Sequence, residues 1–312
     1  MVNFESKQIA LIGDLMLDAY TFGNVERISP EAPVPILHVT SESNQPGGVG
    51  NVALNLAALG SKVRLMGRIG PDSSGEILIK ELQDYKICCK SVISQSDFLT
   101  PRKNRLIAGN QQMARVDHEV IMPINHALEN ALIHSLPNFL SGVGAVALSD
   151  YGKGVLTPNL IQAVIHASKV PVIVDPKGTD FSIYRGACVI KPNLKEAYGA
   201  SGLTHSHSLE QVAEKLLTIT QCKALVITRS EKGISLFRPN AEAKFFPAKN
   251  REVKDVTGAG DTVLATISVA LANGFSIEEA IALANIAAGI AVEGLGCQHV
   301  TLDQMNAVYS SK

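Results

Sequence analysis

Short apolar runs alternate with helix-like segments along most of the chain. The strand candidates are residues 8–13 (QIALIG), 62–70 (KVRLMGRIG), 144–150 (GAVALSD), 170–176 (VPVIVDP) and 223–229 (KALVITR). The helix candidates include residues 51–59, 73–83, 157–168 and 209–219. Such alternation is typical of βα units on a mostly parallel, doubly wound sheet flanked by helices. We therefore predict an α/β fold and a single domain over residues 1–312.

Polar residues stand where several predicted strands end. Ligands of doubly wound sheets bind at the carboxyl ends of the strands. The residues at or just after these ends are Asp14, Asp150, Asp175 and Thr228. A binding site is therefore expected along this edge of the sheet.

Two segments, residues 18–40 and 98–118, interrupt the alternation. Both are extended, punctuated by Pro and Gly, and without a helical period. Although they are far apart in the sequence, we expect them to pair as a small separate sheet.

Charge and cysteine content exclude several kinds of partner. The 28 basic and 29 acidic residues leave a formal charge of −1, so we expect no nucleic-acid or anionic-membrane partner. The first apolar run ends at Asp14 and is too short for a signal peptide or a membrane span. Five cysteines without a C-x-x-C pair fit a reducing compartment, and we expect a cytoplasmic protein.

The stretch DVTGAGDTVLAT, residues 255–266, joins a glycine-rich turn to a helix-like run. The backbone N–H groups of Gly258, Ala259 and Gly260 would converge on an anion, and the helix dipole would add to the attraction. Asp261 beside that anion suits a base that takes a proton from a hydroxyl attacking a phosphate. A capped turn is the structural alternative, because Asp is a favoured cap and Gly a permissive turn residue.

A second glycine-rich turn, PGGVGN, enters another helix at residues 46–51. Gly47 and Gly48 would bring the backbone close to a ligand, and Asn51 offers an amide suited to sugar hydroxyls. Close packing of a helix on the sheet explains these glycines equally well. The G-K-[ST] ending of a P-loop is absent here.

The stretch KPNLKEA, residues 191–197, places Asn193 and Glu196 three positions apart at the start of a helix. This pair would hold Mg²⁺ through water, because Mg²⁺ prefers oxygen ligands and retains its waters. A capping box gives the same spacing, and that structural interpretation is favoured for the motif alone.

In this order and spacing, the glycine pair at residue 47, N-x-x-E and D-x-T-G-A-G-D resemble the ribokinase-like PfkB family of sugar kinases over almost the whole chain. The resemblance implies ATP as co-substrate, Asp261 as catalytic base, and Gly258, Ala259 and Gly260 as the anion hole. It also implies that Asn193 and Glu196 organise Mg²⁺ and the phosphates. Some relatives bind a monovalent cation, to which Asp255 and Thr257 would expose carbonyls.

Further strings, above all RISPEAPVP at residues 27–35, resemble kinases that phosphorylate D-glycero-D-manno-heptose 7-phosphate at the anomeric carbon, towards ADP-heptose and lipopolysaccharide. Bifunctional relatives carry a following nucleotidyltransferase domain. Since this chain ends after the kinase, a separate nucleotidyltransferase and a phosphatase are expected to act downstream. The alternatives are a PfkB kinase for another sugar phosphate or a nucleoside, and a catalytically idle sugar-binding regulator.

A phosphorylated sugar requires carboxylates and amides for its hydroxyls and cations for its distal phosphate. The hydroxyl candidates are Asp14, Asp18 and Asn51. The phosphate candidates are Arg105, Lys153 and Lys177, with Arg27 and Arg115 as further ones; a solvated surface charge is the alternative for each. For the nucleotide, Thr228 and Gly233 would edge the site and Asn285 would lie beside the base.

Transfer to a sugar hydroxyl competes with transfer to water, so such a kinase needs a lid. The resemblance implies that residues 18–40 and 98–118 form it, as a small β-sheet. An apolar lid face with Val34, Ile36 and Met113 would be buried most simply against a second copy. We therefore expect a homodimer joined through its lids.

Overall fold

The structure, a computed structural model, describes residues 2–248, 253–294 and 296–309. Its large sheet consists of β1 (Gln8–Gly13), β4 (Lys62–Ile69), β5 (Cys88–Ser94), β8 (Ala145–Ser149), β9 (Val172–Asp175), β10 (Val189–Ile190), β11 (Ala224–Thr228), β12 (Ile234–Phe237) and β13 (Lys244–Phe246). These strands lie in the order β13-β12-β11-β10-β9-β8-β1-β4-β5. In this order, neighbouring strands from β11 through β1 to β5 pair in parallel, whereas β12 pairs antiparallel with both β11 and β13. The predicted mostly parallel α/β sheet is confirmed.

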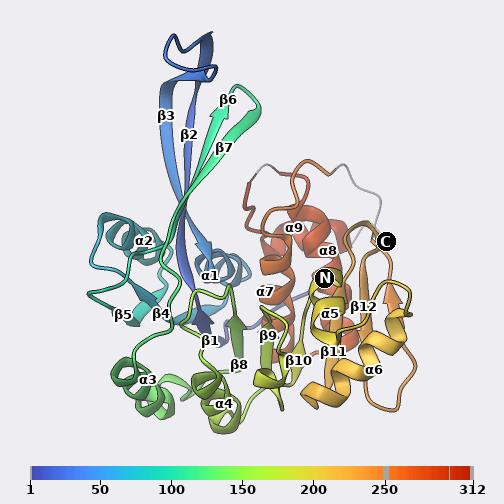
Figure 1. Ribbon diagram of the computed structural model, residues 1–312. Coiled ribbons are helices and arrows are strands. Elements are labelled where there is room, and N and C mark those ends of the chain that lie inside the picture. Colours follow the sequence, from blue (N-terminus) through green and yellow to red (C-terminus); the bar gives the residue numbers. More distant parts are fainter. Residues whose placement is uncertain (1, 249–252, 295, 310–312) are drawn as a thin grey trace.

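Helices cover both faces of this sheet (Figure 1). One face carries α1 (Val49–Ala58), α2 (Ser73–Asp84), α7 (Ala259–Ala272), α8 (Ile277–Ala291) and α9 (Leu302–Tyr309). The other carries α3 (His126–Phe139), α4 (Pro158–Ala167), α5 (Leu194–Ser201) and α6 (Leu209–Thr220), and two short 3₁₀ turns are η1 (Phe181–Tyr184) and η2 (Ser230–Lys232). Along β1, Ile9 and Leu11 enter the first core and Ala10 and Ile12 the second. Burial on both faces explains why the strands read as continuous apolar runs.

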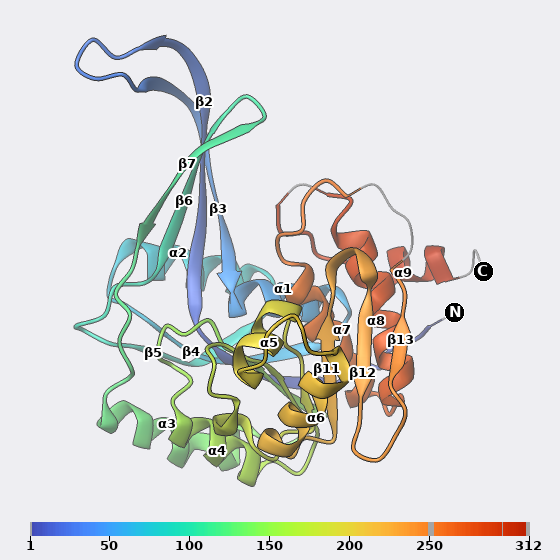
Figure 2. The same ribbon diagram turned by 45° about the vertical axis from the view of Figure 1, so that its right-hand side comes forward.

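A second, four-stranded sheet rises from the carboxyl edge of the large one (Figures 1 and 2). Its strands are β2 (Leu15–Ile28), β3 (Pro35–Gly48), β6 (Arg102–Ala108) and β7 (Gln111–His118), in the order β3-β2-β6-β7. β2 pairs antiparallel with β3 and parallel with β6. Figure 2 shows the β2–β3 hairpin reaching farther from the body than the β6–β7 hairpin. We call this sheet the lid sheet.

The pairing expected for residues 18–40 and 98–118 is therefore present, but β3 is longer than expected. It continues through the polar stretch TSESNQPGG as far as Gly48, which stands opposite Leu15. That stretch lacks the alternating apolar residues that signal a strand, and its pairing is determined by the long neighbour β2. Gly47 and Gly48 thus end a lid strand directly before α1.

None of the helices in the described ranges is long and apolar enough to cross a membrane. All five cysteines are free thiols.

Candidate active site

Asp261 lies in the first turn of α7, buried to 6% exposure. Its Oδ2 accepts a hydrogen bond of 2.6 Å from Asn51 Nδ2, and its Oδ1 accepts one of 2.7 Å from the Tyr151 hydroxyl. The N-cap of α7 is Gly258, and the two bonds direct the Asp261 carboxylate toward α1 and the loop after β8. The capped-turn interpretation of Asp261 is therefore wrong.

The glycines before Asp261 leave room that side chains would fill. Gly258 has φ 79°, and a Cβ there would stand 2.8 Å from Asn51 Nδ2. The first amides of a helix have no intrahelical partners, so the N–H groups of this turn are of the kind that can bind an anion. The Ala259 N–H already makes a long bond of 3.3 Å to the Val256 carbonyl.

A buried cation, Lys191, lies under this turn. Lys191 follows β10, is 2% exposed, and places its Nζ 2.9 Å from Asp175 Oδ2 at the end of β9. A Cβ on Gly260 would stand 3.6 Å from the same Nζ. Burial raises the pKa of Asp175 to about 7, while Lys191 acts to lower it. Sequence reasoning missed Lys191 and Tyr151, although both follow strands whose ends point to the site.

Asp14 does not have the role expected for it. It is 1% exposed, and its carboxylate accepts backbone N–H bonds from Tyr151 and Lys153 at 3.0 Å and from Val155 at 3.1 Å. A carboxylate that is occupied and buried in this way is not available to a sugar hydroxyl. Asp14 instead fixes the loop that carries Tyr151 and Lys153.

Asp18 and Arg105 face each other on neighbouring strands of the lid sheet. Arg105 Nη1 lies 2.5 Å from Asp18 Oδ1, and both side chains are largely buried. A Cβ on Gly47 would stand 2.2 Å from Asp18 Oδ2, so a side chain there would displace the Asp18 carboxylate. Burial opposes the charge of Arg105, but the bond and the charge of Asp18 raise its pKa overall.

Lys153 lies at the root of the lid sheet. Its Nζ donates to Glu119 Oε1 at 2.8 Å, just after β7. Lys103, on β6, stands in register with Asp18 and Asp117. Burial lowers the pKa of Lys103, and the charge of Lys153 lowers it further. Lys103 and Lys153 are thus close enough for their positive charges to repel each other.

Asn193 and Glu196 form the capping box of α5. Asn193 Oδ1 accepts the Glu196 N–H at 2.9 Å, and Glu196 Oε2 accepts the Asn193 N–H at 3.0 Å. The other carboxylate oxygen, Oε1, lies 3.2 Å from Lys177 Nζ. The interpretation of this motif as a capping box is confirmed. Of the lysines proposed for the distal phosphate, Lys177 pairs with Glu196, and Lys153 pairs with Glu119.

The nucleotide candidates have separate surroundings. Thr228 forms a parallel bridge with Asn193, so these two lie side by side. Gly233 has φ 81°, and a Cβ there would stand 2.0 Å from the Phe246 carbonyl. The conformation of the turn therefore accounts for a glycine at this position. Asn285 Nδ2 donates to the Pro247 carbonyl at 2.7 Å.

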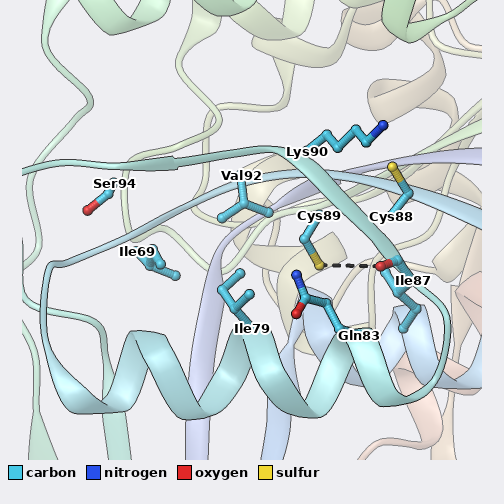
Figure 3. Close-up of a pocket in the computed structure, with 9 residues that line it drawn as sticks. All are labelled: Ile69, Ile79, Gln83, Ile87, Cys88, Cys89, Lys90, Val92 and Ser94. Carbon is cyan, nitrogen blue, oxygen red and sulfur yellow. Dashed lines mark hydrogen bonds between the residues drawn. The ribbon is translucent and has the colours of Figure 1, made fainter.

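Two cavities differ in their relation to these groups. One of about 490 Å³ lies between α2 and β5, where aliphatic side chains such as Ile79 and Val92 point inward (Figure 3). Burial raises the pKa of Cys89 in its wall to about 11, so that thiol stays protonated. A second cavity of about 330 Å³ borders the site and is lined by Asp150 and Lys177 among others.

Comparison with solved structures defines the class of fold. Ribokinase from Thermotoga maritima superposes with a TM-score of 0.78 at 23% identity, covering 97% of this chain and 99% of that one. Phosphofructokinase-2 from Escherichia coli, in complex with potassium, superposes with a TM-score of 0.79 at 20% identity, covering 98% and 99%. The architecture is the ribokinase-like α/β fold.

The chain belongs to the pfkB family of carbohydrate kinases, which matches residues 6–304. It is therefore a sugar kinase of the ATP-dependent type. The bifunctional protein HldE of Trichlorobacter lovleyi is 45% identical over 96% of this chain, and that of Actinobacillus succinogenes is 44% identical over 98%. The chain spans 62% and 64% of the length of these two relatives.

Proposed function

We propose that this kinase transfers the γ-phosphoryl group of ATP to the anomeric hydroxyl of D-glycero-D-manno-heptose 7-phosphate. The observation that carries the proposal is Asp261, buried at the start of α7 and held by Asn51 and Tyr151. The resemblance of residues 27–35 to heptose 7-phosphate kinases, and the identity to proteins named HldE, support the sugar. We expect the reaction in the cytoplasm, followed by phosphatase and nucleotidyltransferase reactions.

Asp261 serves as the general base. As the sugar O–H bond breaks, the proton passes to the Asp261 carboxylate, and the sugar oxygen forms a bond to the γ-phosphorus. The bond from that phosphorus to the β,γ-bridging oxygen breaks, and ADP leaves. The amides of Gly258, Ala259 and Gly260 and the charge of Lys191 stabilise the negative charge on the transferring group.

Asn193 and Glu196 fit Mg²⁺ through water better than by direct contact. Their carboxylate and amide already serve the capping box, and the described residues hold no cluster of three His, Cys, Asp or Glu side chains for direct ligation. Mg²⁺ commonly uses one or two carboxylates together with substrate phosphates, and it neutralises charge on the β- and γ-oxygens. Thr228, beside Asn193, completes the nucleotide side, to which we also assign Lys177.

A monovalent cation is part of the proposal. Asp255 accepts bonds from the Thr257 N–H at 2.9 Å and from the Gly296 N–H at 2.9 Å, which fixes the chain just before the anion hole. A cation bound to carbonyls there would stabilise the same turn. Replacing sodium by potassium in the assay should then raise turnover. Equal rates in the two salts would contradict a role for the cation.

On the sugar side, we assign Asp18 to accept hydrogen bonds from the hydroxyls, and its ion pair with Arg105 would orient the Asp18 carboxylate. We assign Lys103 and Lys153 to the distal phosphate: Glu119 balances one of these two positive charges, and a bound dianion would be attracted by the remaining one.

A panel of sugars and sugar phosphates tests the substrate. ADP release with ATP should be greatest for D-glycero-D-manno-heptose 7-phosphate and should require the 7-phosphate. Turnover with fructose 6-phosphate or a nucleoside, and none with the heptose phosphate, would favour another PfkB reaction. Binding of the sugar with no ADP release from any compound would favour the regulatory alternative.

We also propose that two copies join through their lid sheets. Val34 and Met113 are 51% and 42% exposed and Ile36 is half-buried; Ile28 and Val39 add to this surface. Apolar side chains that the lid sheet leaves exposed are covered most simply by the same sheet of a second copy.

Sedimentation at micromolar concentration should then give a dimer, and Met113→Asp should shift it to monomer because the charge would be buried. Phe245→Asp, on the exposed edge strand β13, is the matched control and should remain dimeric. A dimer that Phe245→Asp dissociates and Met113→Asp leaves intact would place the interface on the large domain.

A further inference from the structure

The contact between Tyr151 and Asp261 is not explained by the roles assigned above. The phenol is neither in the anion hole nor on the lid sheet, yet its hydroxyl donates to Asp261 Oδ1 at 2.7 Å. Burial raises the pKa of Tyr151 well above its usual value, so the hydroxyl keeps its proton and remains a donor.

The loop holds the phenol in place through its backbone. The N–H groups of Tyr151, Lys153 and Val155 all donate to the Asp14 carboxylate. Arg68 adds a second tie, because its Nη2 donates to the Lys153 carbonyl at 2.7 Å. A loop fixed at four backbone groups can hold a hydroxyl at a set distance from a carboxylate.

The surroundings of Asp261 make such a donor consequential. The charged and titratable groups that act on the carboxylate are Tyr151, Lys191, Asp18, Asp175 and Cys297. Lys191 is the cation among these, while the aspartates disfavour a further negative charge. Burial raises the pKa of Asp261, and the bonds from Asn51 and Tyr151 and the charge of Lys191 act to lower it.

We propose that Tyr151 is a positioning residue for the catalytic base, which holds the Asp261 carboxylate in one orientation and favours its ionised form. This rests on the proposed role of Asp261. Asn51 donates to one oxygen of the Asp261 carboxylate and Tyr151 to the other. Each oxygen keeps a free lone pair, which can accept the proton of the sugar hydroxyl.

Tyr151→Phe tests this through the pH profile of kcat/KM. A protonated Asp261 cannot accept the hydroxyl proton, so activity falls on the acid side as pH drops through the pKa of the base. Without the phenol donor the ionised form is less favoured, and this acid limb should move to higher pH by about one to two units. On the plateau above it, turnover should return to within a few-fold of wild type.

Tyr184→Phe is the matched control. The Tyr184 hydroxyl donates to Asp150 Oδ2 at 2.6 Å, so this variant also loses a phenol–carboxylate bond, but at another carboxylate. Its acid limb should stay at the wild-type pH. Thermal unfolding and ATP binding, measured for both variants, test whether each is folded.

Two outcomes overturn the inference: an unmoved acid limb in a folded Tyr151→Phe enzyme, or equal movement in both variants. Either can occur with a fully active wild type, which leaves the proposed function standing. An inactive wild type, by contrast, contradicts the proposed function itself.

Discussion

Asp261→Asn is expected to lower turnover by roughly 10²–10⁴-fold while nucleotide binding is retained. The amide has the shape of the carboxylate: its oxygen still accepts from Asn51, and its NH₂ can donate to a rotated Tyr151 hydroxyl. The site therefore keeps its packing and loses the proton acceptor. Steady-state ADP release, with ATP binding measured by calorimetry, separates the two properties.

Asp72→Asn is the matched control for this change. Asp72 is the N-cap of α2 and accepts backbone bonds from Gly75 and Thr100 at 2.9 and 2.8 Å, away from the candidate site. Because Asn caps helices as well as Asp does, this variant should keep wild-type turnover. If Asp261→Asn also turned over at a near-normal rate, positioning in the anion hole would be sufficient for transfer, and the base would have to be abandoned.

Lys153→Met is expected to weaken binding of the sugar phosphate by about one to two decades, since a charge-assisted contact is worth roughly 1.5–3 kcal/mol. Methionine keeps most of the side-chain length, so the loss reports the charge. The KM for ATP should barely change. The sharper measurement compares the phosphorylated sugar with its dephosphorylated form, because the preference for the first should shrink in the variant.

Two further lysines separate the possible phosphate sites. Lys177→Met should raise the KM for ATP, because Lys177 pairs with Glu196 on the nucleotide side. Lys80→Met, on the exposed surface of α2, should change neither constant. Sugar-phosphate binding that is intact in Lys153→Met and weakened in Lys177→Met would move the phosphate to the cavity lined by Asp150 and Lys177.

Most of the fold could be predicted from local pattern. The apolar runs of β1, β8, β9 and β11 are buried on both faces, and such burial appears in the sequence as a run of apolar residues without alternation. The lid sheet was predictable only in part. Its strands have few neighbours to pack on, so residues 40–48 of β3 carry no alternating apolar pattern and are paired through β2 alone.

The glycine turn at Gly258 and the helix that begins after it could be predicted from the sequence, and with them the position of Asp261 in the first helical turn. The catalytic role of Asp261 stays a prediction. Asp14 shows the limit: a carboxylate at a strand end suits a sugar hydroxyl and a set of backbone amides equally, and only the structure shows that the amides have it. Tyr151 follows β8 and Lys191 follows β10, and both lie at the site because β8, β9 and β10 are neighbours in the sheet. Composition and motif spacing do not reveal this order of the strands.

Asp14 is also the single residue between β1 and β2, and so it joins the rigid sheet to the lid sheet. Its carboxylate also accepts the backbone N–H groups of Tyr151, Lys153 and Val155. The strand that leads into the lid sheet and the loop that carries Tyr151 are therefore anchored at one buried residue, so a substitution at Asp14 would disturb the two together.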